Sequence, residues 1–118
     1  MTIIVNIDIL YLDLSTMLLV EFQTKELENL YTWADNWRWY YPPAVIRKYI
    51  KLVNLMQAVD TLSEINKFWW YMIEQKKWNM KWIWAARLSD TWRLEFTVDN
   101  QWNIQVILLQ KISHHYWD

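Results

Sequence analysis

The sequence contains no glycine and no cysteine among its 118 residues, although glycine usually makes up about 7% of a chain. Without cysteine, the chain forms no disulfide scaffold and no cysteine-ligated metal site. Without glycine, it has no glycine-rich phosphate-binding loop, and the His-Glu-x-x-His zinc helix and the nucleophile elbow are missing as well. The sequence therefore excludes catalysis through the well-known motifs of these kinds.

Tryptophan, in contrast, occurs 11 times. Trp37 lies in the loop-like stretch Ala34-Asp35-Asn36-Trp37-Arg38-Trp39, and Trp102 lies in the turn-like stretch Asp99-Asn100-Gln101-Trp102-Asn103. Such places usually need a positive φ, which glycine adopts freely and a bulky aromatic residue does not. We interpret nine tryptophans as occupants of glycine positions, through deliberate replacement or through a glycine codon read as tryptophan. They are Trp33, Trp37, Trp39, Trp69, Trp70, Trp78, Trp82, Trp102 and Trp117.

The charge of the chain is distributed unevenly along its length. The net charge is −1, yet residues 38–93 carry ten Lys or Arg residues against four acids, and both flanking segments are acidic. The chain is long enough for one domain with a single hydrophobic core. A basic centre in a nearly neutral domain favours a local anionic partner, although solvated helix and strand faces explain such asymmetry about as often.

The first nineteen residues are apolar but do not resemble a signal peptide. They have no basic segment and no small-residue cleavage site, and Asp8 and Asp13 interrupt the apolar run. The same two acids argue against a membrane span, which needs about 20 mostly apolar residues. We therefore expect a cytoplasmic protein that is neither secreted nor inserted in a membrane.

The first part of the chain predicts helices. Thr24 is a suitable N-cap for a helix with Leu27, Leu30 and Tyr31 on one side, and Pro43 suits the first position of a second helix. Residues 61–64 (Thr-Leu-Ser-Glu) fit a capping box that starts a short third helix. The second helix carries an apolar stripe at helical spacing, made of Val45, Tyr49, Leu52, Met56 and Val59. Arg47, Lys48 and Lys51 lie away from this stripe.

In the rest of the chain, the spacing of apolar residues changes from the helical period to the period of two that is typical of strands. Residues 17–22 and 82–88 each predict a strand, and Ser89-Asp90 predicts a tight turn after the second. Residues 91–98 alternate apolar and polar side chains, which is typical of a strand covered on one face. Residues 104–109 are almost continuously apolar, as in a strand covered on both faces. The predicted fold is α+β, with an N-terminal helical pair packed on a small, mostly antiparallel sheet.

Residues 77–96 resemble the signature of the RelE/HigB-like toxins of bacterial type II toxin–antitoxin systems, within the RelE/ParE superfamily. In that family a strand of the pattern K-G-x-x-x-G-x-[WY] leads through a polar turn into W-R-[LI]-x-F. Trp84, Trp92 and Arg93 fit this pattern directly, and Trp78 and Trp82 fall on its glycines. Residues 41–48 (YPPAVIRK) are similar to the start of a helix in the family. The resemblance implies one RelE/HigB-like toxin domain over residues 17–118, with residues 1–16 as an N-terminal extension of uncertain origin.

The resemblance further implies a ribosome-dependent mRNA endonuclease (an mRNA interferase) that inhibits translation. Its implied partners are the ribosome, mRNA in the ribosomal A site and a cognate antitoxin protein that silences it. Cleavage through the 2′-OH of the RNA needs no metal and no cofactor. It needs a base near that hydroxyl, cationic donors around the phosphorane and an acid for the leaving oxygen.

Basic residues that can contact phosphates lie within or beside the matched stretch. Arg87 and Arg93, on neighbouring predicted strands, would clamp the scissile phosphate. Lys76, Lys77 and Lys81 would hold flanking phosphates. Without the motif, a solvent-exposed pair of Arg93 with Glu95 is favoured about two to one, and lysines that merely keep the loop soluble are as probable as phosphate ligands.

The C-terminal tail supplies groups for proton transfer. Histidine is a common proton carrier in catalysis, so His114 or His115 is the better candidate, and Tyr116 can stack on a base or orient it. The tail departs from the usual endings of the family, so the choice among these three residues stays open, and a frayed tail is the simpler alternative. Adjacent histidines diverge on a helix or strand, so a shared metal ion is not expected.

Two functional alternatives remain open at the level of the sequence. The ParE-type toxins share this topology but poison DNA gyrase, and an antitoxin-binding domain without activity is a third reading. Basic strand residues followed by a His/Tyr tail favour cleavage, because a gyrase binder needs no proton-transfer group. Trp84 and Trp92 are expected in the core, not on a base-stacking surface.

Replacing Trp102 with glycine should raise the stability of the chain, because the substitution relieves a turn that an aromatic residue strains. Relief of one strained residue is worth about 1 to 3 kcal/mol, and thermal unfolding measures it. Trp84→Gly is the matched control and should lower the stability, since Trp84 is expected in the core. Ordinary tryptophan codons at all nine positions in a standard-code organism would count against misreading.

Overall fold

The structure, a computed structural model, describes residues 17–32, 40–76, 82–101 and 103–114. The proposed N-terminal extension, residues 1–16, lies outside the described residues. The elements in chain order are β1 (Met17–Phe22), α2 (Lys25–Thr32), α3 (Pro43–Ala58), the short 3-10 helices η3 (Leu62–Lys67) and η4 (Trp69–Tyr71), β2 (Glu74–Gln75), β3 (Ile83–Arg87), β4 (Trp92–Gln101) and β5 (Ile104–His114).

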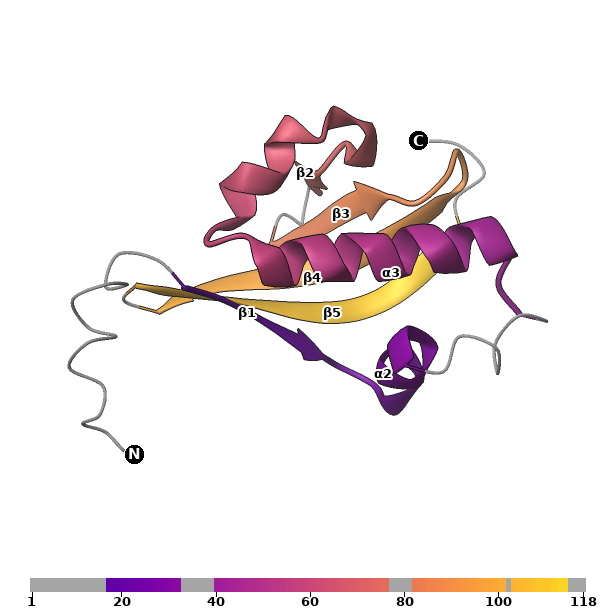
Figure 1. Cartoon of the computed structure of the whole chain (residues 1–118), viewed down its shortest axis with the longest axis horizontal. Helices are drawn as coiled ribbons and strands as arrows, with labels where there is room; N and C mark the ends of the chain where they lie inside the picture. The colour runs from indigo at the N-terminus through magenta and orange to yellow at the C-terminus, as the bar shows by residue number, and fades with distance from the viewer. Residues whose placement is uncertain (1–16, 33–39, 77–81, 102, 115–118) are drawn as a thin grey trace.

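Five strands form one sheet in the order β1-β5-β4-β3-β2. Strand β1 runs parallel to β5, and the other three pairings are antiparallel. Parallel strands need a crossover, and here the chain passes through both α-helices and strands β2 to β4 before β5 returns beside β1. Helix α3 lies along one face of the sheet (Figure 1). The predicted α+β class with a mostly antiparallel sheet is confirmed.

Local signals position the helices. The backbone N–H of Leu27 donates to Thr24 Oγ1 at 3.2 Å, so Thr24 is the N-cap of α2. Pro43 is the first residue of α3, where its missing N–H has no cost. Thr61 and Glu64 form the predicted capping box, although the helix that follows is 3-10.

No helix in the described part of the chain is long and apolar enough to cross a membrane.

The hydrophobic core lies between α3 and one face of the sheet. Four stripe residues of α3 are buried, and the fifth, Val59, follows the end of the helix and is partly buried. From the sheet they meet Ala86, Leu94, Phe96, Ile107 and Leu109. The Tyr49 hydroxyl donates to the carbonyl oxygen of Leu27 at 2.8 Å and joins α3 to α2 inside this core.

The link between β3 and β4 differs from the sequence prediction. Four residues, 88–91, separate the strands instead of the tight turn at Ser89-Asp90. Leu88 is buried in the core, and its backbone N–H donates to the carbonyl oxygen of Trp92 at 2.9 Å across the loop. Ser89 Oγ accepts the backbone N–H groups of Thr91 at 3.4 Å and Trp92 at 3.2 Å, which satisfies the backbone of the wider loop.

The prediction that β4 is covered on one face only is wrong. Arg93 is 8% exposed and Glu95 is 4% exposed, although both point away from the apolar face of the strand. The alternation of apolar and polar residues correctly separated the two faces. This alternation could not show that polar side chains from neighbouring strands cover the face of β4 that carries Arg93 and Glu95.

Three of the tryptophans interpreted as occupants of glycine positions lie in the described part of the chain. Trp69, Trp70 and Trp82 are exposed by 74%, 41% and 60%. Among the described residues, only Met72 has a positive φ, so these three positions do not use the left-handed conformation. Trp84 and Trp92 are instead partly buried against the core, as expected. The backbone of Trp37 and Trp102 lies outside the described residues.

Tyr49→Phe should destabilise the fold by about 1 to 2 kcal/mol, because the buried Leu27 carbonyl loses its donor. The substitution removes one oxygen and leaves the shape of the core intact. Tyr31→Phe is the matched control: its hydroxyl bonds to Asn54 and Gln57 at the surface, so its effect should stay within about 0.5 kcal/mol. Denaturant unfolding measures both, and equal losses would contradict the role assigned to Tyr49.

Candidate functional site

Arg87 and Arg93 lie directly opposite each other on β3 and β4. Cross-strand partners share one face of a sheet, and this face is opposite α3 because the alternating residues Ala86 and Leu94 belong to the core. We call it the far face. Like charges placed directly opposite each other are destabilising. An anion held between the two guanidinium groups would remove that cost.

Both arginines contact the loop between their strands. Arg93 Nη1 donates to the carbonyl oxygens of Ser89 at 2.7 Å, Asp90 at 3.2 Å and Trp92 at 3.1 Å, and so holds the loop in place. Arg87 Nη1 lies 3.8 Å from a carboxylate oxygen of Asp90, whose side chain is 97% exposed. Among the described residues, Arg87 Nε is the one buried side-chain nitrogen or oxygen that has no hydrogen-bond partner. A buried donor without an acceptor costs free energy.

Glu95 is the centre of a buried polar network on the same face. Its Oε2 accepts a hydrogen bond from Ser113 Oγ at 2.7 Å, and Lys76 Nζ lies 3.3 Å from the same oxygen. Lys111 is the cross-strand partner of Glu95 on β5. The alternative of a solvent-exposed Arg93–Glu95 pair is therefore overturned, since both side chains are buried.

The charges around Glu95 keep its carboxyl group ionised. Burial by itself raises the pKa of this group, because a low-polarity surrounding disfavours the charged form. The hydrogen bond from Ser113, the charges of Lys76 and Lys111 and the hydrogen bond from Lys76 act in the opposite direction. Together they outweigh burial and hold the pKa of Glu95 below its usual value.

His114 lies on the other side of the sheet from the arginine pair. It is the cross-strand partner of Trp92, whereas Arg93 is the partner of Ser113. The His114 ring stacks on the Trp92 ring with centroids 4.3 Å apart and planes inclined by 10°. Its Nε2 lies 3.2 Å from Thr91 Oγ1. The structure thus brings Arg87, Arg93 and Lys76 to one face and places His114 on the opposite one.

The remaining residues predicted for the site are Lys77, Lys81, His115 and Tyr116, and all four lie outside the described residues. Within the described ranges, no group of three or more His, Cys, Asp or Glu side chains is arranged to hold a metal ion.

Sequence reasoning missed three polar residues of the far face. Glu95 was assigned only a surface pairing, and Ser113 and Glu74 were assigned no role. Glu74 is exposed and is the cross-strand partner of Ala85, which is the partner of Glu95, so all three lie in one row. The alternation over residues 91–98 places Glu95 beside Arg93, but the two-residue strand β2 is too short to give a periodic signal for Glu74.

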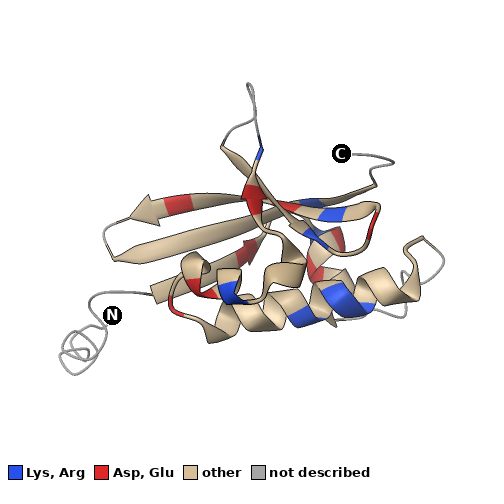
Figure 2. Ribbon diagram, turned by 90° about the horizontal axis from the view of Figure 1, so that it is seen from above, with Lys and Arg blue, Asp and Glu red and all other residues tan. Residues whose placement is uncertain are grey.

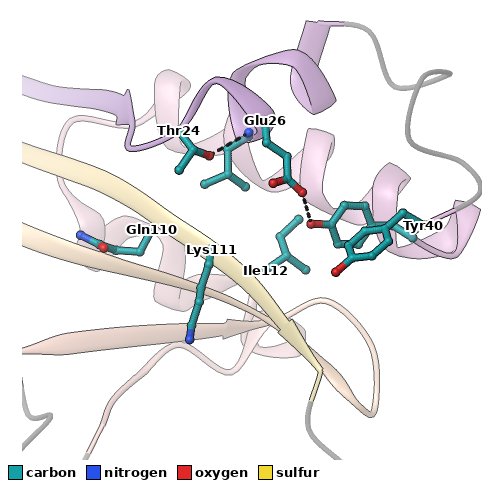
Figure 3. Close-up of a pocket in the computed structure, with 8 residues that line it drawn as sticks. Thr24, Glu26, Tyr40, Gln110, Lys111 and Ile112 are labelled. Carbon is teal, nitrogen blue, oxygen red and sulfur yellow. Dashed lines mark hydrogen bonds between the residues drawn. The ribbon is translucent and has the colours of Figure 1, made fainter.

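An open hollow of about 220 Å³ lies between α2 and the C-terminal part of β5 (Figure 3). The Tyr41 hydroxyl donates to Glu26 Oε2 at 2.9 Å at this hollow. Burial, and then this hydrogen bond to Glu26, raise the pKa of Tyr41. The hollow contains none of the predicted site residues. Its lining consists of Thr24, Glu26, Leu27, Tyr40, Tyr41, Gln110, Lys111 and Ile112.

The likeness of this chain to known proteins is one of fold and not of sequence. No family model matches the sequence, and no curated protein is similar to it in sequence. Among solved structures, the YoeB/ParE toxin from Agrobacterium tumefaciens aligns with a TM-score of 0.50 at 16% sequence identity, over 85% of this chain and 99% of that one. This likeness shows that the chain has the RelE-like α+β fold predicted for it.

Two further solved structures align more loosely. HP0894, a conserved hypothetical protein from Helicobacter pylori, gives a TM-score of 0.45 at 11% identity, over 85% of this chain and 94% of that one. The toxin–antitoxin complex RelBE2 from Mycobacterium tuberculosis gives a TM-score of 0.43 at 21% identity, over 82% of this chain and 96% of the other.

The stability that Glu95 contributes should be lost in acid. Its folded-state pKa is below the ordinary value of 4.5, so its contribution is fully present above that pH and falls as the pH drops toward the folded-state pKa. Thermal unfolding from pH 7 down to pH 3 should therefore show a smaller decline for Glu95→Gln than for the wild type. An identical decline in both proteins would contradict the ionised network.

Proposed function

We propose that the protein is the toxin of a toxin–antitoxin module and cleaves mRNA on the ribosome, acting as an endoribonuclease that stops translation. The toxin domain would span residues 17–118, with residues 1–16 as an extension of uncertain origin. Such an enzyme works in the cytoplasm, where ribosomes and mRNA are. The fold shared with the YoeB/ParE toxin supports the toxin class, and the residues of the far face support the chemistry.

The observation that carries the proposal is the pair Arg87 and Arg93. The two residues are directly opposite on adjacent strands, and Arg87 Nε is buried without a hydrogen-bond partner among the described residues. A phosphate diester supplies what this arrangement requires: negative charge between two cations and oxygens that accept from planar N–H groups. Arg93 also holds the loop after β3 and so fixes the position of the pair.

Phosphates that flank the cleavage position would contact Lys76, Lys77 and Lys81. Of the three tail residues predicted to transfer the proton to the leaving 5′-oxygen, His114 lies on the face opposite the arginine pair, so His115 or Tyr116 would take this role.

Glu74 is the described carboxylate best suited to accept the proton of the 2′-OH. It is exposed on the far face, diagonal to Arg87, and diagonal cross-strand neighbours are within reach of long side chains. Glu95 is a poorer base, because its carboxylate is buried and already bound by Ser113 and Lys76.

The antitoxin would silence the enzyme by covering the far face. Its acidic residues would pair with the lysines and arginines there and compete with RNA for the same cations. A gyrase poison of the ParE type remains the second candidate, because the similar Agrobacterium protein is itself named a YoeB/ParE toxin.

Arg87→Gln should lower mRNA cleavage on translating ribosomes by about 100-fold or more, the usual cost of losing a donor that stabilises transition-state charge. Primer extension on a defined mRNA measures the cleavage rate. Arg47→Gln is the matched control, because it removes the same charge from the exposed side of α3, and it should leave the rate within about twofold.

Arg93→Ala should abolish cleavage as well, but it also releases the loop carbonyls, so its thermal stability must be compared with that of Arg87→Gln. Growth arrest with intact mRNA and damaged DNA would replace the nuclease proposal with gyrase poisoning. Absence of any toxicity would favour a domain that binds antitoxin without activity.

A further inference from the structure

We propose that Glu95 is an internal counter-ion that pairs with Lys76 in the free protein. Lys76 must leave Glu95 before it can contact an RNA phosphate, and the cost of breaking this pair weakens binding of RNA to the far face. This inference rests on the proposed function, which makes the far face the RNA-binding surface. It adds a residue that sets the affinity and selectivity of that surface.

The position of Glu95 is unusual for a charged residue. Its side chain is 5% exposed in a strand that has neighbours on both sides, whereas Lys76 retains 24% exposure. Charges are rarely buried unless they are paired. The carboxylate is also the acid nearest in register to the arginine pair on β4, two residues from Arg93. It therefore places a fixed negative charge inside a surface suited to anions, as the mixed signs on the strands in Figure 2 illustrate.

The two partners of the ion pair differ in their freedom to move. Glu95 belongs to a ten-residue strand, and Ser113 Oγ binds its carboxylate at 2.7 Å. Lys76 follows the two-residue strand β2 at the edge of the sheet, and a lysine side chain is long and flexible. When a phosphate approaches, we therefore expect the lysine to exchange partners while the carboxylate stays in place.

Exchange of the lysine leaves Glu95 with other partners. The hydrogen bond from Ser113 remains, and the charge of Lys111 lies in the same cross-strand row. The carboxylate therefore does not become an isolated buried charge, which would be far more costly. The cost of exchange stays small enough for a phosphate correctly placed between Arg87 and Arg93 to overcome. RNA that contacts only the lysines would not overcome this cost. The surface would therefore select RNA that places a phosphate between the two arginines over RNA that does not.

The test measures binding of a single-stranded 2′-O-methyl RNA oligonucleotide, which keeps the phosphates and lacks the nucleophile. Fluorescence anisotropy at low and at high salt compares the wild type with Glu95→Gln. Glutamine has nearly the same shape and can still accept hydrogen bonds from Ser113 and Lys76. We expect Glu95→Gln to bind roughly three- to tenfold more tightly at low salt, with a smaller difference at high salt.

Two further variants separate the effect of charge from the effect of structure. Ser113→Ala removes the hydrogen bond to Glu95 but keeps its charge, so its affinity should stay within about twofold of the wild type. Lys76→Gln, introduced together with Glu95→Gln, should remove most of the tightening, because the gain comes from a freed lysine. If Glu95→Gln does not fold, Lys76→Gln alone decides: it loses the phosphate contact and leaves the charge of Glu95 uncompensated, so binding more than about twofold weaker supports the exchange, and unchanged binding contradicts it.

Equal or weaker RNA binding by folded Glu95→Gln would overturn the counter-ion role, and so would tightening that persists without Lys76. Cleavage of mRNA on ribosomes is measured in parallel. A wild type that cleaves mRNA while Glu95→Gln binds RNA no more tightly refutes this inference alone. A wild type that cleaves nothing refutes the proposed function, while tighter binding by Glu95→Gln would still establish the counter-ion.

Discussion

Burial of charge on strand β4 is the constraint on which the far face of the sheet depends. Arg93 and Glu95 are both buried, and a buried ion is tolerated only when hydrogen bonds and opposite charges replace its water. Arg93 obtains them from the carbonyls of the loop after β3. Glu95 obtains them from Ser113 on β5 and from Lys76 beside β2. The loop geometry, the position of the arginine pair and the pairing of Lys76 all follow from this requirement.

The opposite face supplies the stability that this arrangement needs. Helix α3 covers the sheet with an apolar stripe, and buried tyrosine Tyr49 joins it to α2 through the Leu27 carbonyl. Because hydrophobic burial provides most of the free energy of folding, the far face is free to carry charges. The sheet therefore separates a face that stabilises the fold from a face that carries the buried charges, and both depend on the same strand β4.

Strongly periodic segments were predictable from the sequence, and short or mixed ones were not. The strand at residues 17–22, the N-cap at Thr24 and the helix that begins at Pro43 are all signalled by neighbouring residues. The loop at residues 88–91 was predicted too short, because its width follows from the burial of Leu88 and the side chain of Ser89. Strand β5 extends beyond the apolar run to His114, because its C-terminal residues also pair with β4.

The sequence by itself determined the fold class, the apolar faces and the neighbouring strands that carry Arg87 and Arg93, because alternation and helical spacing are local properties of a chain. Only the tertiary structure decided that the two arginines are directly opposite, that Glu95 is buried with Lys76 and Ser113, and that His114 stacks on Trp92 on the other face. Cross-strand register and burial depend on residues distant in the chain, and no local pattern encodes them.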